Sequence, residues 1–139
     1  LVMHRHTPEI EQEMGKAAGK DVSVIFTPHL LPINRGILST IYLDLKQKIS
    51  QKEVYELYQE FYKNDYFVRI NEELPEIKNI KNTNICEIGL RVHEEKNKVI
   101  IVSTIDNLIK GAGGQAVQAM NIMFGIDEKE GLSYLSMYI

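Results

Sequence analysis

Two histidines flank an arginine at the start of the chain, and a threonine–proline pair typical of a helix start follows them. If this stretch is extended, His4 and His6 point to one side and Arg5 to the other. The positive end of a following helix disfavours an imidazolium ion, and a neutral imidazole is what a general base requires. The same helix end, with Arg5 nearby, would also attract a phosphate or carboxylate. The stretch is therefore suited to proton transfer beside an anionic substrate.

Two other interpretations of the histidines stay open at this point. Histidines near a chain start are usually solvated surface residues, and the spacing alone favours this simpler interpretation. His4 and His6 could also supply two metal ligands, but no cluster of carboxylates or cysteines in the sequence completes such a site. We therefore expect no metal centre, and a metal-dependent enzyme built on the two histidines stays an alternative.

Helix and strand patterns alternate along the chain, and they must position these residues. Helices are expected over 7–18, 51–62 and about 108–124, and strands over 21–27, 37–45, 66–70, 85–92 and 98–105. The segments 28–36 and 71–84 are expected to be loops. Adjacent strands with short connections favour an antiparallel or mixed sheet with helices packed on it, so the predicted fold class is α+β.

Local signals predict several element boundaries and one buried residue. Thr7 is expected to cap the first helix and Gly19 to end it. Ser50 and Glu53 predict a capping box at the second helix. Cys86 lies on the apolar face of its strand and is expected to be a buried, unreactive thiol. Because it is the only cysteine, no internal disulfide can form, which indicates a reducing compartment.

The helix expected over about 108–124 is unusual in two ways. It contains Gly111, Gly113 and Gly114, and each interior glycine costs a helix roughly 1 kcal/mol relative to alanine. Either the glycines allow another backbone or a ligand to approach closely, or 107–114 is partly loop, and both alternatives stay open. The helix is also apolar over most of its surface, which indicates partners on several sides.

Composition and charge exclude several classes of protein. The 139 residues, 44% of them hydrophobic, suit one domain. The formal net charge of -3 gives no argument for nucleic acid or an anionic membrane, and no apolar run approaches the roughly 20 residues of a membrane span. No signal peptide is visible, so we expect a cytoplasmic protein. The first residue is leucine rather than methionine, which suggests a processed product or a piece of a longer chain.

Four blocks of the sequence together resemble one enzyme family. The blocks are HRHTPEIEQ, TPHLLPINRGI, TNICEIGL and DNLIKGAGGQAVQAMN, which follow one another between residues 4 and 121. They resemble N-acetyl-gamma-glutamyl-phosphate reductase, an oxidoreductase family of arginine biosynthesis. The combination of HRHTPEIEQ with KGAGGQAVQ is specific. The last block is also similar to the late helix of the more distant aspartate-semialdehyde dehydrogenases.

The resemblance implies a reaction and a set of site residues. Family members use a cysteine thiolate to attack an acyl phosphate and expel phosphate, after which NADPH reduces the thioacyl enzyme to N-acetylglutamate semialdehyde. A histidine assists the cysteine and the proton transfers. By the match to the first block this base is His6, and His4, Arg5 and Glu9 line the same site. Arg35, in the second block, is expected to contact the substrate or its phosphate.

The resemblance also implies a cofactor, because the late glycine-rich helix of the family packs on a Rossmann domain and helps to bind NADPH. The matching positions for NADPH or NADP are Asn107, Gly111, Gly113 and Gln115, with most of the cofactor site in the Rossmann domain. Residues 107–124 then have a partner, which would explain their glycines and apolar faces.

Two parts of the family pattern are absent from this sequence. It contains no Gly-Cys nucleophile motif and no GxGxxG, and Cys86 falls in the third block, so it is not assigned as the nucleophile. We therefore expect residues 1–139 to be a C-terminal catalytic and dimerisation domain, with a fold like that of glyceraldehyde-3-phosphate dehydrogenase-like enzymes. It should be inactive alone and form a homo-oligomer, a dimer or a tetramer. The alternative is a non-catalytic dimerisation or regulatory module derived from the family.

Overall fold

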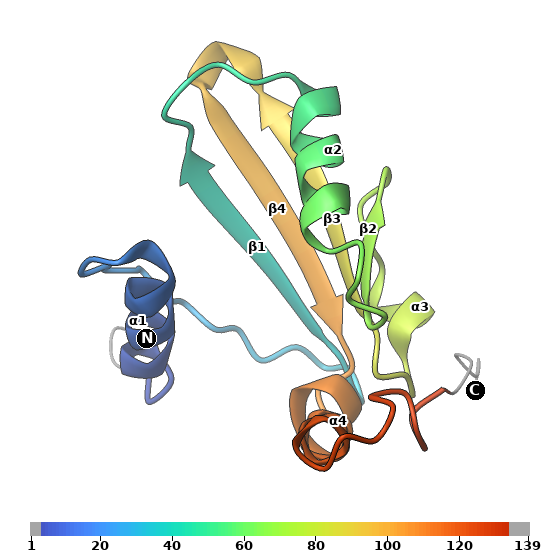
Figure 1. Cartoon of the computed structure of the whole chain (residues 1–139). Coiled ribbons are helices and arrows are strands. Elements are labelled where there is room, and N and C mark those ends of the chain that lie inside the picture. The colour runs from blue at the N-terminus through green and yellow to red at the C-terminus, as the bar shows by residue number, and fades with distance from the viewer. Residues whose placement is uncertain (1–3, 134–139) are drawn as a thin grey trace. The chain divides into compact units, whose positions relative to one another are not determined.

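The chain divides into two compact units, the first ending at Ile33 and the second beginning at Asn34. The structure, a computed structural model, describes residues 4–133. The first unit contains one helix followed by an irregular segment, and the second contains a sheet with its own helices. Figure 1 labels the elements of both units.

Helix α1 (Thr7–Ala18) has the predicted bounds, but its cap differs from the expected one. The N-cap is His6 rather than Thr7, because the first helical hydrogen bond is accepted by the carbonyl of His6. The side chain of this cap makes no capping hydrogen bond. Gly19 ends the helix as predicted, with a left-handed φ of 64° and an N–H that donates to the Gly15 carbonyl.

The strand predicted over 21–27 is wrong, because no residue of this segment is in a strand. β-Branched residues favour a strand only where a neighbouring strand pairs with them, and the described part of the first unit contains no such strand. Ile25 and Leu30 are accordingly 99% and 101% exposed. The loop predicted over 28–36 is confirmed.

The second unit is built on a four-stranded sheet. Its strands are β1 (Ile37–Asp44), β2 (Val68–Asn71), β3 (Cys86–His93) and β4 (Lys98–Ile105). They lie in the order β1-β4-β3-β2, with β4 antiparallel to both of its neighbours and β2 parallel to β3 (Figure 1). The sheet is therefore mixed, and the predicted α+β class is confirmed.

Helix α2 (Gln51–Phe61) covers one face of the sheet beside β3 and begins at the predicted capping box. The backbone N–H of Glu53 donates to the Ser50 hydroxyl at 3.2 Å, and the Ser50 N–H donates to the Glu53 carboxylate at 2.9 Å. The main core lies between this helix and the sheet. Its buried members are Val54, Ile88, Leu90, Val99 and Ile101.

Cys86 packs against this core, so its predicted strand face is correct. It is half-buried rather than buried, because it lies at the end of β3, where its Sγ is 3.4 Å from the Ser103 hydroxyl. The expected full burial of this thiol is therefore wrong.

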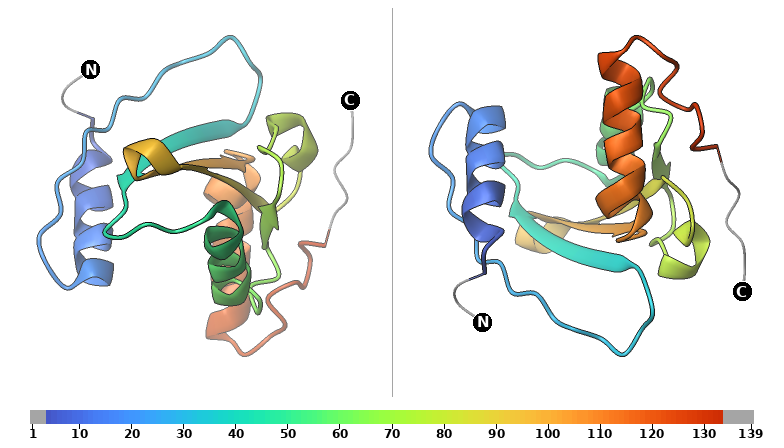
Figure 2. Two further views of the ribbon diagram at one scale, coloured as in Figure 1. Left: turned by 90° about the horizontal axis from the view of Figure 1, so that it is seen from above. Right: turned by 90° about the horizontal axis from the view of Figure 1, so that it is seen from below.

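The other face of the sheet is covered by the segment predicted as a loop over 71–84. This segment contains a short helix, α3 (Ile77–Ile80), which is too short to show a helical period in the sequence. Figure 2 shows α2 and α3 on opposite faces of the sheet. Gly89 of β3 allows this covering, because a Cβ there would lie 2.7 Å from Pro75 and 2.8 Å from the Glu73 carbonyl oxygen.

The helix expected over about 108–124 is present, but its first turn is wider than an α-helix. Residues Ile109–Gly113 form a π-helical turn that continues into α4 (Gly114–Met123), and only 107–108 are a non-helical turn. Of the three glycines in this stretch, Gly114 is the one that allows another part of the chain to approach closely. A Cβ there would press on the Asn84 side-chain oxygen and lie 2.8 Å from the Ile109 carbonyl oxygen.

We expect Gly114→Ala to lower the free energy of unfolding by about 1–3 kcal/mol, because the added methyl overfills a packed position. The matched control is Gly113→Ala, where the nearest atom to a Cβ is 3.6 Å away and little change is expected. Urea unfolding of both variants measures the difference. Equal stabilities would contradict the packing role of Gly114.

Candidate active site

His6 stands at the turn that starts α1. Its carbonyl accepts the Ile10 N–H at 3.0 Å, and the Thr7 N–H donates to the His4 carbonyl at 3.0 Å. The His6 N–H donates in turn to the His4 ring at Nδ1, at 3.3 Å. The two imidazole rings meet edge to face, with centroids 4.9 Å apart and an interplanar angle of 69°. The candidate base is therefore in direct contact with the other histidine.

The four candidate residues of the first unit lie together on this turn. Arg5, His6 and Glu9 are exposed and His4 is half-buried, with Glu9 in the first turn of α1. No other described residue hydrogen-bonds a ring nitrogen of His6. An exposed imidazole at the positive end of a helix, with a guanidinium beside it, can take up a proton next to an anion.

One candidate residue of the second unit, Arg35, pairs with a buried carboxylate, Asp106, which directly follows β4. Its side chain is 0% exposed. Oδ1 accepts the N–H groups of Leu108 and Ile109 at 2.8 and 3.1 Å, which caps the start of the following helical segment. Oδ2 accepts the Asn82 N–H at 2.8 Å and lies 3.3 Å from Nε of Arg35. Asp106 was not among the residues predicted from the sequence, although an aspartate at the start of an expected helix is typical of a cap.

Arg35, the candidate for contact with substrate, is engaged with this centre. Its Nε pairs with Asp106, and its Nη1 donates to the Asn82 side-chain oxygen. Only a quarter of the side chain is exposed. The neighbouring Gly36 N–H donates to the side-chain oxygen of Asn107 at 2.7 Å. The loop before β1 is therefore tied to the residues that follow β4.

The candidate cofactor residues lie on one continuous stretch. Gly111 and Gly113 are exposed on the π-helical turn, Gln115 is exposed on the first turn of α4, and Asn107 is half-buried just before them. The exposed faces of the two glycines leave the backbone open to a ligand, and the carboxamides of Asn107 and Gln115 can donate and accept hydrogen bonds.

A polar cluster beneath this stretch was not predicted. Gln118, 8% exposed, accepts from Asn84 Nδ2 at 2.9 Å and from Lys110 Nζ at 2.7 Å, and its own amide donates to Glu128 at 2.8 Å. Lys110 also lies 5.5 Å from the centroid of the Phe67 ring. Burial lowers the pKa of this lysine from its usual value. The sequence signal for this cluster was Gln118 itself, a polar residue within a largely apolar helix.

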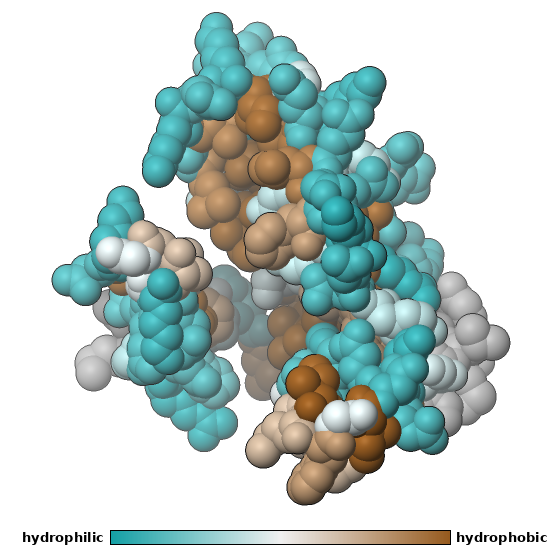
Figure 3. Space-filling model, in the orientation of Figure 1, coloured by the Kyte–Doolittle hydropathy of each residue, from teal (hydrophilic) through white to brown (hydrophobic). Residues whose placement is uncertain are grey.

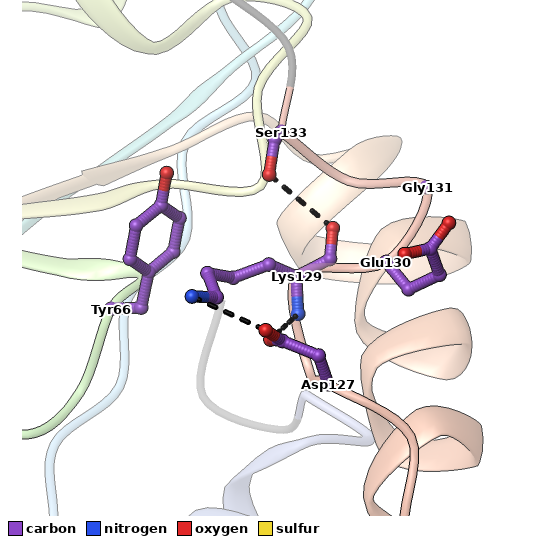
Figure 4. A pocket seen from close by; sticks show the side chains of 6 residues that line it. All are labelled: Tyr66, Asp127, Lys129, Glu130, Gly131 and Ser133. Carbon is purple, nitrogen blue, oxygen red and sulfur yellow. Dashed lines mark hydrogen bonds and ion pairs between the residues drawn. The ribbon is translucent and has the colours of Figure 1, made fainter.

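One open cavity, of about 540 Å³, contains none of the candidate site residues in its lining. It is lined by Tyr66, Asp127, Lys129, Glu130, Gly131 and Ser133 (Figure 4). In it, Lys129 lies 5.1 Å from the Tyr66 ring centroid and pairs with Asp127 at 3.3 Å. Within residues 4–133 no three acidic, histidine or cysteine side chains are grouped as metal ligands, and no helix is long and apolar enough to cross a membrane.

Comparison with known proteins agrees with the four sequence blocks. The most similar relatives include proteins named N-acetyl-gamma-glutamyl-phosphate reductase from Clostridium novyi (strain NT) and Caldicellulosiruptor bescii. The first is 54% identical over 98% of this chain and 39% of its own length, and the second is 55% identical over 99% and 40%. The chain thus spans about two fifths of the length of these relatives.

A family model described as "Semialdehyde dehydrogenase, dimerisation domain" matches residues 1–107. This match covers α1, most of the sheet unit and the candidate residues from His4 to Asn107. The resemblance drawn from the sequence blocks is confirmed, and the chain belongs to the semialdehyde dehydrogenase family, of which it contains the dimerisation domain.

Proposed function

We propose that the chain is the catalytic and dimerisation domain of a cytoplasmic reductase of arginine biosynthesis. The whole enzyme would convert N-acetylglutamyl 5-phosphate to N-acetylglutamate 5-semialdehyde and phosphate, with NADPH as the reductant. One observation carries this proposal: relatives named for that activity are at least 50% identical over nearly the whole chain. The exposed imidazole of His6 at the start of α1 supports the proposal, because such a group can act as a general base.

His6 is proposed as the base that accepts the proton of a cysteine thiol supplied by another part of the enzyme. Its exposed ring lies at the start of α1, where a thiol from outside this chain can reach it. Once protonated, it can return that proton as the tetrahedral adduct collapses to product. Arg5, His4 and Glu9 are proposed as substrate contacts, with the Arg5 guanidinium suited to a phosphate oxygen pair.

The residues proposed for the cofactor fit a dinucleotide in their chemistry. The exposed backbone at Gly111 and Gly113 allows close approach, and the Asn107 and Gln115 carboxamides suit a nicotinamide or ribose. NADPH bound there supplies a hydride. Arg35 is proposed as a substrate or phosphate contact through the guanidinium nitrogen that neither Asp106 nor Asn82 holds.

Helix α4 is proposed to pack on a Rossmann domain outside this chain. Helix α4 and Phe124, which directly follows it, expose these apolar side chains: Val117 at 37%, Met120 at 46%, Ile122 at 59%, Met123 at 81% and Phe124 at 76%. Figure 3 shows apolar side chains gathered over this helix. A helix with apolar residues exposed to this extent is stabilised by a neighbour that covers them.

A homo-oligomer is proposed to form through β1. Helix α2 covers the sheet beside β3 and β2, and leaves β1 uncovered. Figure 3 shows apolar side chains over the sheet beside α2. The exposed apolar residues of β1 are Ile37, Leu38, Ile41, Tyr42 and Leu43, between 38% and 67% exposed. The family description as a dimerisation domain supports a second copy as the partner of this strand.

The decisive test of the activity is NADPH oxidation by the full-length enzyme with N-acetylglutamyl phosphate. We expect His6→Ala to lower kcat by about 10²–10⁴-fold, because a positioned general base contributes that much. The control is His93→Ala, which removes the histidine at the end of β3 and should leave kcat unchanged. Wild-type turnover in His6→Ala would remove this residue from the mechanism.

We expect Ile41→Glu to convert the oligomer to smaller species, because a carboxylate at the centre of β1 cannot be buried without a partner. Light scattering coupled to size-exclusion chromatography measures the mass. Lys52→Glu changes an exposed residue of α2 and serves as the charge control, with no change of mass expected. An unchanged mass for Ile41→Glu would exclude β1 from the interface.

A further inference from the structure

We propose that Phe26 and Glu11 are positioning residues for the base His6, and that they act on it through the ring of His4. All four residues belong to the first unit. The role of His6 as the base rests on the proposed function, whereas the arrangement of the two histidine rings does not.

Glu11 of α1 anchors the segment that carries Phe26. The carboxylate of Glu11 accepts the Ser23 hydroxyl at 3.2 Å and the Val24 N–H at 3.0 Å. These partners lie 12 and 13 residues further along the chain, in a segment that makes no strand. A hydrogen bond from a backbone N–H to a charged carboxylate is stronger than one between neutral groups, so Glu11 fixes this segment against the helix.

An aromatic ring of the same segment lies against His4. Phe26 follows Val24 by two residues, and its ring centroid lies 5.2 Å from that of His4 at an angle of 72°. This is the edge-to-face geometry that aromatic rings prefer. Phe26 is half-buried, whereas its neighbour Ile25 is 99% exposed, so the segment turns this one ring towards the histidines.

The ring of His4 in turn contacts His6. Nδ1 of His4 accepts the His6 N–H at 3.3 Å, which requires Nδ1 to carry no proton and the neutral ring to be protonated at Nε2. The His4 and His6 rings also meet edge to face, with their centroids 4.9 Å apart. His4 therefore contacts both the backbone and the ring of the base, and Phe26 packs against the ring of His4.

Such a constraint matters to catalysis because proton transfer depends on distance and angle. A misplacement of a catalytic group by about 1 Å can cost on the order of 10²-fold in rate.

The test uses the full-length enzyme, labelled with 15N in histidine only. Long-range 1H–15N correlation spectra, with His4 assigned through His4→Asn, report which ring nitrogen carries the proton. We expect the Nε2–H form for His4 in the wild type and a mixture of both forms in Phe26→Ala. In kinetics, Phe26→Ala should lower kcat about tenfold, or about 1.4 kcal/mol in barrier height, with little change in KM or in the unfolding temperature.

Two matched controls separate positioning from general support of the fold. Ile25→Ala alters the adjacent, fully exposed residue, and Phe26→Tyr keeps an aromatic ring, so both should retain wild-type kcat and spectra. Glu11→Ala releases the segment without touching a ring and should reproduce the effect of Phe26→Ala. Glu13→Ala, on the same helix, removes only contacts with Gln12 and Lys16 and should not.

The inference is overturned by a wild-type His4 protonated at Nδ1, by wild-type kcat and spectra in Phe26→Ala, or by a loss of kcat that follows a loss of unfolding temperature. If Phe26→Ala does not fold, Glu11→Ala against Glu13→Ala decides the question. Absence of wild-type activity on N-acetylglutamyl phosphate would defeat the proposed function alone, because the His4 spectra still test the ring arrangement.

Discussion

The Asp106 carboxylate is the point on which the second unit depends. It is fully buried, and a buried charge is tolerated only where hydrogen bonds and an opposite charge replace its hydration. Three backbone N–H groups and Arg35 meet that requirement. Hydrogen bonds to a charged group contribute about 1.5–3 kcal/mol each, so this carboxylate fixes the exit of β4, the start of the helical segment and the loop around Asn82 together.

The glycine-rich stretch begins at this carboxylate. Asp106 binds the N–H groups of Leu108 and Ile109, and a π-helical turn follows in which the Gly111 N–H donates to the Asp106 backbone carbonyl at 2.9 Å. π-Turns of this kind are frequent at functional sites. Gly114 then lies against Asn84, whereas Gly111 and Gly113 face outward. One glycine therefore serves packing, and the other two leave the backbone accessible.

In the first unit the carboxylate of Glu11 likewise holds a distant segment of the chain in place. Glu11 binds a hydroxyl and a backbone N–H of an otherwise irregular segment, which has no sheet to satisfy it. In each unit an acidic side chain thus holds a distant stretch of backbone next to candidate site residues. The candidates themselves, His6 and the open glycine turn, stay exposed, which a group that must reach a substrate or a cofactor requires.

What the sequence determined by itself was local. The bounds of α1, the Gly19 stop, the Ser50–Glu53 box and the four strands of the sheet all follow from signals within a few residues, because capping and alternation are short-range effects. The candidate site residues followed from short motifs and their resemblance to a family. The roles of Asp106 and Glu11, which hold the segments around those candidates, did not follow from the sequence.

Only the tertiary structure decided which partners those residues have. The strand predicted over 21–27 failed because pairing needs a neighbour that propensity cannot supply, and α3 was too short to show a period. Arg35 meets Asn82 across 47 residues, and Gly36 meets Asn107 across 71. Contacts at such separations leave no periodic trace in a single sequence. The hydrogen-bonding groups are therefore visible in the sequence, and only folding selects which of them meet.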